Sequence, residues 1–436
     1  MSEPVNIDAQ VYFPLRYEDT VIEISKLIAD CSRPFFDRYV GTGLIEVHRT
    51  HNDGAGRQRH HAIHLATEHL VEVEAFVADF KRKLSALPTP PKLIVSPTHR
   101  AGQALAQVAK EFFASIGHPC PIFAHDTLFL RPEDIELRRI LSDAEEVDAL
   151  LIVDDVFLTG TRVAQYQRYA RSAHYKGRIH YFVGIARPQD AAVWTKSKRM
   201  LAFRAGMTPP HTLDCVDMVI LPDWRERDCP WCAELRLYSS WSQTASLTEE
   251  LALRHEALQS AQQTGLTSDL FLQITDLPSL ALGPTSFFTT QSANQAEVFA
   301  AIAAALQHLR TQTIPQKPRL GPRHFPISTV LNYQDYLCAT WTDSILRASF
   351  LRAATADELT YADPGKEDAR TQQLMDVIMQ DGDGEHDIAL EVLLAAILGK
   401  CRVRISEALK ARLQAFGAGK LGAYLVNMLE GKRVQV

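Results

Sequence analysis

The stretch that decides the fold is ALLIVDDVFLTGTRVAQ, residues 149–165. It opens with the apolar run 150–153, which is typical of a strand buried on both faces of a parallel sheet. Asp154 and Asp155 come next, and a Thr-Gly-Thr turn at 159–161 leads into a helical pattern. Because parallel sheets bind ligands at the carboxyl ends of their strands, the paired acids mark a candidate site.

The residue types of this stretch suit a sugar phosphate. Asp154 and Asp155 can accept hydrogen bonds from neighbouring ribose hydroxyls or hold hydrated Mg²⁺. The backbone N–H groups of the following turn and helix start form an anion site, to which Thr159, Gly160, Thr161 and Arg162 contribute. The stretch therefore predicts a site for a ribose 5-phosphate; the alternative is a strand end whose acids merely cap the turn.

The surrounding sequence alternates strand and helix signals. Unbroken apolar runs predict strands near 44, over 92–96, 120–125 and 179–186, and around 215–222. We expect a helix over 64–84 and another after the loop SPTHRAG, residues 96–102. Such alternation predicts an α/β fold with a parallel sheet covered on both faces. The loop follows the predicted strand at 92–96, so it lies at the carboxyl edge of the sheet, where ligands bind.

Residues 150–162 resemble the phosphoribosyl diphosphate signature of type I phosphoribosyltransferases, and the resemblance extends over about residues 40–235. It implies that fold, binding of phosphoribosyl diphosphate or a nucleotide with Mg²⁺, and catalytic roles for Asp154 and Asp155. SPTHRAG takes the place of the family's pyrophosphate loop, which makes Thr98, Arg100, Ala101 and Gly102 candidate phosphate-binding residues. HDTLFLRPEDIELRR, residues 125–139, takes the place of the family's flexible loop, with Arg138 and Arg139 as candidate ligands.

Three positions depart from the family pattern. Leu158 stands where a small polar residue is usual, and Arg162 stands where a phosphate-binding Thr or Ser is common. The pyrophosphate loop reads Arg100-Ala101-Gly102 rather than Arg-Gly-Gly. Arg162 can pair with a phosphate through its planar guanidinium, or it can fill the pocket.

The second half of the chain reads as helices. Ser246 and Glu249 form a capping-box pattern, and further helical patterns continue to the C-terminal region. We expect two domains: an α/β domain over 1–241, with a flexible N-terminus at 1–20, and a mostly α-helical domain over 242–436. The helical domain is predicted to make homo-oligomer or protein-partner contacts.

Composition narrows the function classes. The net charge of −6 argues against a global basic field for nucleic acid, although a local basic patch leaves such a partner open. The longest nearly apolar run, 388–398, is about half of what a membrane helix needs. The acidic N-terminal stretch lacks a signal peptide's apolar segment, and the odd number of cysteines, seven, favours a reducing compartment, so we expect a cytoplasmic protein without membrane partners.

Cysteine and histidine spacing suggests a structural Zn²⁺ site. His211, Cys215, Cys229 and Cys232 form the pattern H-x3-C-x13-C-x2-C, a set of four tetrahedral ligands. Small buried thiols or a local redox pair remain the alternatives. The histidines between 48 and 69 are interpreted as a polar loop leading into a helix; the alternative is a hood over the acceptor or a basic contact.

Two functions follow from these patterns. The first is transfer of ribose 5-phosphate from phosphoribosyl diphosphate to a base or amine with release of diphosphate. The alternative is an effector or regulator of a bacterial antiviral defence system, for example one associated with a reverse transcriptase, that binds or modifies nucleotides with a nucleic-acid or protein partner. The long helical extension favours the alternative, since a simple salvage enzyme does not need it. A purely structural scaffold is a third reading.

Overall fold

The structure of the 436-residue chain is a computed structural model. It describes residues 14–17, 20–23, 33–52, 58–125, 132–143, 149–202, 211–244, 247–272, 293–311, 344–360, 364–378, 386–415 and 419–434.

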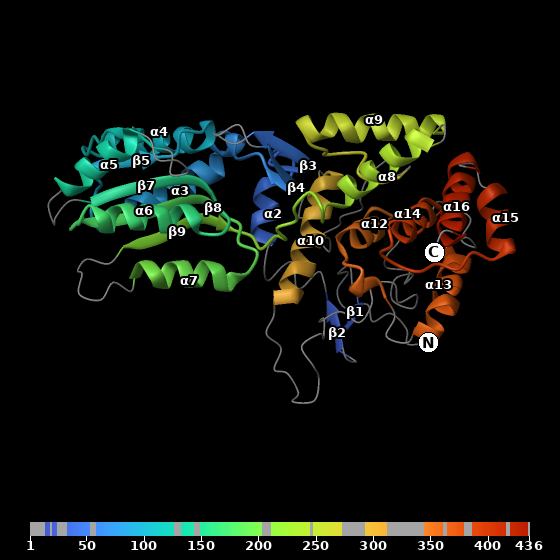
Figure 1. Cartoon of the computed structure of the whole chain (residues 1–436). Coiled ribbons are helices and arrows are strands. Elements are labelled where there is room, and N and C mark those ends of the chain that lie inside the picture. Colours follow the sequence, from blue (N-terminus) through green and yellow to red (C-terminus); the bar gives the residue numbers. More distant parts are fainter. Residues whose placement is uncertain are drawn as a thin grey trace.

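A five-stranded parallel sheet forms one end of the elongated molecule (Figure 1). Its strand order is β6-β5-β7-β8-β9, so β7, which carries the paired acids, is the central strand. The strands are β5 (Leu93–Ser96), β6 (Ile122–Ala124), β7 (Ala149–Phe157), β8 (Arg178–Ala186) and β9 (Thr212–Met218).

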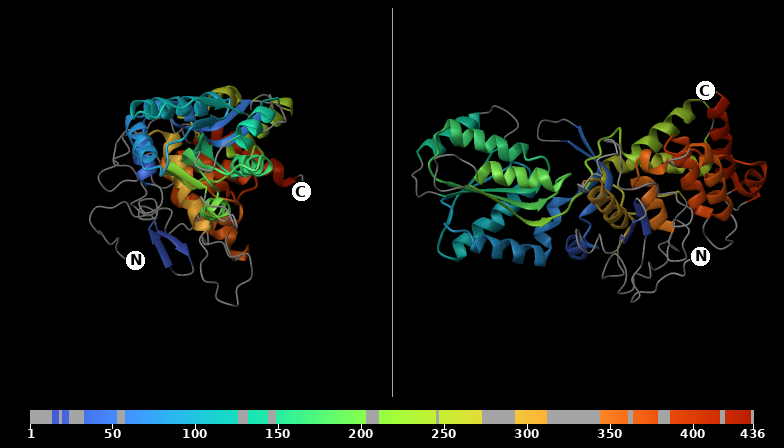
Figure 2. Two further views of the ribbon diagram at one scale, coloured as in Figure 1. Left: turned by 90° about the vertical axis from the view of Figure 1, so that its left-hand side faces the viewer. Right: turned by 90° about the horizontal axis from the view of Figure 1, so that it is seen from below.

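Helices cover both faces of this sheet because its strands are apolar on both sides. Leu151 and Val153 of β7 belong to the hydrophobic cluster shared with one helical layer, and Leu150 and Ile152 belong to the cluster of the other. The first layer contains η1 (Thr67–Glu72), α3 (Glu74–Ser85) and α4 (Arg100–Ser115). The second contains α5 (Pro132–Ser142), α6 (Thr161–Ser172) and α7 (Ala191–Ala202), and the view from below separates the two layers (Figure 2).

An antiparallel hairpin lies between the sheet and the helices of the second half (Figure 1). Its strands are β3 (Ile45–Asn52) and β4 (Gln58–Leu65), and Val47 is bridged to Leu266 through both backbone hydrogen bonds. The elements around it are α2 (Arg33–Tyr39), α8 (Pro230–Thr244), α9 (Glu249–Thr264) and the nearly wholly buried α10 (Gln295–Thr311). The helices beyond are α12 (Ser344–Ala353), η2 (Asp357–Leu359), α13 (Pro364–Ile378), α14 (His386–Ile397), α15 (Glu407–Ala415) and α16 (Gly419–Val434).

The hydrophobic core continues across residue 241. One cluster of buried side chains runs from Phe35 through Phe80 and Trp231 to Leu425. Buried charges also join the two parts, because Arg352 of α12 donates to Glu234 of α8 at 2.7 Å. The division at 241/242 stays a prediction; the helical character of the second part is confirmed.

Several sequence expectations need correction. The expected helix over 64–84 is divided among the end of β4, η1 and α3, because the segment 58–65 pairs with β3 across the hairpin. Most of the histidines that were expected in a polar loop lie instead on the two strands of this hairpin. Within the N-terminal segment 1–20, β1 (Pro14–Tyr17) pairs with β2 (Thr20–Glu23), and the expected flexibility of this segment stays a prediction.

A local correction concerns the start of α9. Its N-cap is Thr248, whose hydroxyl accepts from Leu251 N at 3.4 Å, whereas Ser246 lies outside the described residues. Among the helices that the structure describes, none combines the length and apolar character needed to cross a membrane.

Candidate functional site

The paired acids lie within the central strand rather than after it. β7 continues to Phe157, with Asp154 in register with Val183 of β8. Asp154 and Asp155 are 9% and 5% exposed, so their partners in the chain determine their charge state. The pairing with β8 extends the strand beyond the four apolar residues from which the sequence predicted it.

Arg162 forms an ion pair with Asp154. Its Nη1 donates to both Oδ1 and Oδ2 of that carboxylate at 2.5 Å, from the first turn of α6. Burial alone would raise the pKa of Asp154, but Arg162 and His99 outweigh it and hold that pKa well below its ordinary value. The same ion pair raises the pKa of Arg162 despite its burial. The residue predicted to bind phosphate therefore neutralises a candidate catalytic acid.

His99 and Thr67 complete the surroundings of the acids. His99 Nε2 lies 3.3 Å from Asp155 Oδ1 and 3.6 Å from Asp154 Oδ1, and the Thr67 hydroxyl donates to Asp155 Oδ2. His99 Nδ1 accepts from Gly102 N at 3.2 Å as the N-cap of α4, so the neutral ring carries its proton on Nε2, facing the acids. Neither residue was predicted from the sequence, because Thr67 belongs to no motif and His99, although it lies in the loop 96–102, is not one of the residue types expected to bind phosphate there.

Opposed effects set the pKa values here. Burial raises the pKa of Asp155, and the charge of Asp154 adds to this against the pull of His99. Burial lowers the pKa of His99, but the carboxylates of Asp155 and Asp154 outweigh it, and the pKa is raised. The charge of each of these three side chains therefore depends on the other two, and one ligand atom from each lies within 4.8 Å of the others, as in a metal site.

The turn after β7 has the predicted form. Gly160 is the N-cap of α6 with a left-handed φ of 75°, and a Cβ there would come 2.7 Å from Ser197 Oγ. The hydroxyls of Thr159 and Thr161 lie 2.7 Å apart, and both residues are exposed. The first turn of α6 thus presents hydroxyls and helix N–H groups of the kind that bind anions.

The loop over 96–102 brings His99, not Arg100, to the acids. Thr98 and Arg100 are exposed, while Ala101 and Gly102 are buried in the first turn of α4. A Cβ on Gly102 would meet the Pro97 ring at 3.0 Å, so the glycine lets the loop fold tightly onto α4. A hollow of about 570 Å³ beside the loop is lined by Thr98, Arg100, Gln103, Ala104, Gln107 and Ile122.

Arg138 and Arg139 lie on a helix. The segment expected to be a flexible loop over 125–139 forms α5 from Pro132 onward, and residues 126–131 lie outside the described part of the chain. Both arginines are exposed, and the guanidinium of Arg138 lies 5.6 Å from the ring centroid of Tyr169. Residues 132–142 are helical because Leu137 and Leu141 of α5 are buried in the same hydrophobic cluster as Tyr166 of α6.

The four predicted zinc ligands separate into two places. His211 accepts from Ile179 N at 3.0 Å through Nδ1, and Cys215 lies in β9 opposite Val183. Cys229 and Cys232 lie instead with His48 and His60 of the hairpin. The predicted set is therefore wrong in its first half: His211 directly precedes β9 and Cys215 lies within it, whereas Cys229 and Cys232 lie at the start of α8, against the hairpin.

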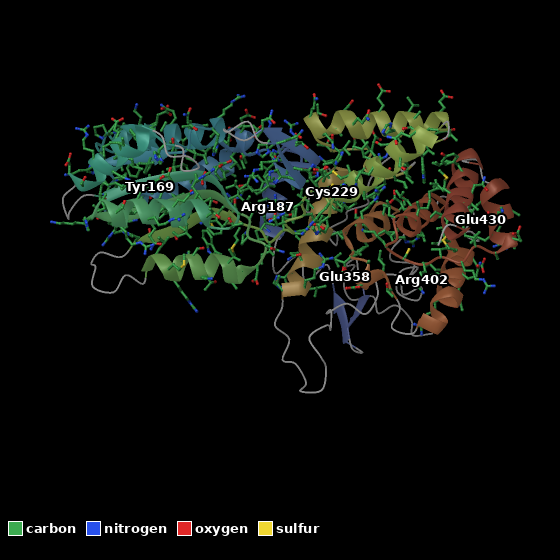
Figure 3. The ribbon with its side chains drawn as sticks, viewed as in Figure 1. Tyr169, Arg187, Cys229, Glu358, Arg402 and Glu430 are labelled. Atoms are coloured by element: carbon green, nitrogen blue, oxygen red, sulfur yellow. The ribbon has the colours of Figure 1, made fainter. Side chains whose placement is uncertain are left out.

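A second group of histidines comprises His51, His61 and His64. It lies beside Arg187, which directly follows β8 and is labelled in Figure 3. Arg187 is buried, donates to Ile63 O at 2.7 Å and Pro222 O at 3.0 Å, and has its pKa lowered to about 10 by burial. Burial and this cation lower the pKa of His61 to about 2. Burial, with His51 next, lowers the pKa of His64 to about 3. These imidazoles are therefore neutral in the folded chain at physiological pH.

The chain was compared with known proteins and structures. No family model and no curated protein matches it. Among solved structures, orotate phosphoribosyltransferase from Francisella tularensis is similar at 12% identity over 52% of this chain and 94% of that one, with a TM-score of 0.27. Adenine phosphoribosyltransferase from Trypanosoma brucei, in complex with AMP, pyrophosphate and ribose-5-phosphate, is similar at 9% identity over 43% and 78%, with a TM-score of 0.29. UMP synthase from Leishmania donovani is similar at 12% identity over 54% of this chain, with a TM-score of 0.26, and the match spans 41% of that enzyme.

The fold class predicted from the sequence is confirmed. The chain has a five-stranded parallel sheet with helices on both faces, followed by a mostly helical part. The central strand carries the acids and leads directly into the turn at the start of α6.

Proposed function

We propose that the chain binds phosphoribosyl diphosphate or a nucleotide at the junction of β7 and α6. The observation that carries this proposal is the succession of Asp154 and Asp155, the left-handed Gly160 and the N-terminus of α6 along the central strand. It joins carboxylates that can accept hydrogen bonds from vicinal hydroxyls to a turn whose N–H groups can donate to a phosphate.

Binding would require Arg162 to change partners. In the present arrangement its guanidinium pairs with Asp154, so ribose hydroxyls compete with it for the carboxylate. Arg162 stands two residues after Gly160, so a 5-phosphate held at the turn offers its guanidinium a doubly charged alternative. The ligand would thereby free Asp154 for the sugar. Asp155 keeps its bond from Thr67 while its other oxygen faces His99.

The carboxylate oxygens also fit a magnesium ion. Oxygen ligands of one or two carboxylates are what Mg²⁺ takes when it arrives with a phosphate ligand, and Asp154 and Asp155 would hold it. When bound, Mg²⁺ supplies positive charge that neutralises the diphosphate. The exposed Arg100 and the N–H groups at the start of α4 would contribute further positive potential beside it.

If transfer follows, the bond from the anomeric carbon to diphosphate breaks, and a bond from that carbon to a ring nitrogen or amine forms. Asp154 and Asp155 would hold the ribose and favour the positive charge that develops on its anomeric carbon. The reaction class is glycosyl transfer with diphosphate release.

The neutralised acids support a second candidate, ligand binding without turnover. Arg162 and His99 both place positive charge or a donor beside the carboxylates that transfer would use. This arrangement suits a nucleotide-sensing effector or regulator, including one of an antiviral defence system. In that role residues 242–436 would hold a protein or nucleic-acid partner.

Isothermal titration with phosphoribosyl diphosphate and Mg²⁺ tests the site. We expect binding by the wild type and a loss of at least about tenfold in affinity for Asp154→Asn/Asp155→Asn, since neutral amides lose charge-assisted bonds of roughly 1.5–3 kcal/mol each. Asp214→Asn is the matched control, an aspartate on β9 whose side chain is 47% exposed, and it should bind like the wild type.

A wild type that does not bind, or equal loss in the control, would refute the proposed site. Thermal unfolding of each variant separates lost binding from lost fold. Diphosphate release with a panel of bases then distinguishes the two candidates: release indicates transfer, and binding without release indicates a sensor.

A further inference from the structure

Four metal-ligating side chains meet between the hairpin and α8. His48 lies on β3 and His60 on β4, while Cys229 directly precedes α8 and Cys232 lies in its first turn. One ligand atom from each lies within 4.8 Å of the others, and both thiols are free of disulfides. We call these residues the His2Cys2 cluster. Figure 3 places Cys229 at the centre of the molecule, between the sheet and helices α12–α16.

The distances within the His2Cys2 cluster match those around a tetrahedral zinc ion. Cys232 Sγ lies 3.6 Å from His48 Nδ1 and 3.4 Å from His60 Nε2, and Cys229 Sγ lies 3.7 Å from His48 Nδ1. With zinc–sulfur bonds of about 2.3 Å and zinc–nitrogen bonds of about 2.0–2.1 Å, tetrahedral geometry separates sulfur from nitrogen by about 3.5 Å. The four atoms therefore surround a space of the right size.

Each histidine is oriented by a partner on its other ring nitrogen. His48 Nε2 lies 3.0 Å from the carbonyl oxygen of Leu258, to which it can only donate. His48 Nδ1 is then unprotonated in the neutral ring and faces both sulfurs. His60 Nδ1 pairs with Thr50 Oγ1 at 3.1 Å, which leaves Nε2 for the cluster. Outer hydrogen bonds of this kind fix the tautomer of zinc-binding histidines.

Hydrogen bonds between thiol and imidazole do not account for this arrangement. His48 Nδ1 has a single lone pair, yet it lies nearly equally far from two sulfur atoms. His48 and Cys229 are fully buried and Cys232 is 2% exposed, so bulk water does not reach these ligand atoms. His48 also holds a left-handed φ of 58°, a conformation that costs a non-glycine residue energy and that surrounding contacts must stabilise. A central cation accepts all four lone pairs at once.

We propose that the His2Cys2 cluster binds a structural zinc ion. Two thiolates with two imidazoles favour Zn²⁺ over the oxygen-seeking Mg²⁺ and Ca²⁺, and four protein ligands leave no open position for catalysis. The ion would cross-link residues about 180 apart in the chain, since Cys229 and His48 are 181 residues apart. It would fix the hairpin to α8 and so hold the sheet against the helical part.

Metal analysis of the full-length protein tests the proposal. We expect about one zinc per chain in protein purified without chelators, and almost none in Cys232→Ser or His60→Gln. Cys215→Ser is the matched control, because Cys215 is a free thiol in β9 that lies outside the cluster, and it should keep its zinc.

A spectroscopic measurement on the wild type tests the proposal even if the variants fail to fold. Cobalt(II) exchanged into the wild type should give the intense visible bands of tetrahedral coordination together with thiolate charge-transfer absorption. Wild-type protein without zinc that gives no such bands, or zinc lost equally in Cys215→Ser, would overturn the proposal. A Cys229–Cys232 disulfide in the metal-free wild type, detected by mass spectrometry, would identify a redox pair instead.

Discussion

Replacing Arg352 by Met should destabilise the protein by about 3–5 kcal/mol, because it removes the cation shared by two buried carboxylates. Arg352 donates to Glu391 Oε2 and Glu234 Oε2, each at 2.7 Å. Glu234 and Glu391 are at most 1% exposed, so water cannot take the place of the guanidinium. Arg254 would still pair with Glu234, whereas Glu391 would keep only neutral donors such as Leu272 N.

Denaturant unfolding at neutral pH measures this loss as a decrease in the free energy of unfolding. Arg82→Met is the control, since Arg82 pairs with Asp79 on the surface with its side chain 68% exposed, and it should cost less than about 1 kcal/mol. Similar losses in the two variants would show that the buried network does not hold α8, α12 and α14 together.

Acid should destabilise the folded chain through the histidines around Arg187. The pKa values of His61 and His64 fall to about 2 and about 3 in the fold, below the ordinary 6.5. Below about pH 6.5 these two histidines bind protons in the unfolded chain but stay neutral in the folded chain. The free energy of unfolding therefore decreases as the pH falls below this value. Between pH 7.5 and 5 each histidine should cost roughly 2 kcal/mol.

Unfolding free energies of the wild type and His64→Gln over this range check the expectation. The variant should lose roughly 2 kcal/mol less than the wild type, because glutamine does not titrate. Loss of zinc at low pH would affect both proteins alike and so cancels in the difference. The exposed His118 serves as control, and His118→Gln should follow the wild-type curve. If the free energy of unfolding falls equally with pH in His64→Gln and the wild type, His64 is not buried in its neutral form.

The sheet was predictable from sequence because its strands bury both faces. Apolar runs such as Leu150–Val153 have no other stable place in a chain of this composition. β4 was not predictable in the same way: its sequence QRHHAIHL contains three histidines, and only pairing with β3 across the hairpin makes it a strand. Tertiary pairing outweighed the helical spacing that the sequence shows from His64 onward.

The candidate site was predictable only in its local part. Asp154, Asp155 and Gly160 lie close together in the sequence, at the junction of a strand and the helix that follows it, so their proximity in space follows from the sequence. Thr67 comes to Asp155 from η1, 88 residues earlier, and no spacing rule links them. The cysteine pair was likewise visible as C-x-x-C, while its histidine neighbours lie on a hairpin far away in the chain.

A crystal structure of the protein with phosphoribosyl diphosphate and Mg²⁺ tests the central proposal most directly. We expect the ribose hydroxyls at Asp154 and Asp155, the 5-phosphate at the N–H groups of the turn around Gly160, and the Arg162 guanidinium moved from Asp154 to that phosphate. A ligand bound elsewhere, with the pair between Arg162 and Asp154 intact, would contradict it.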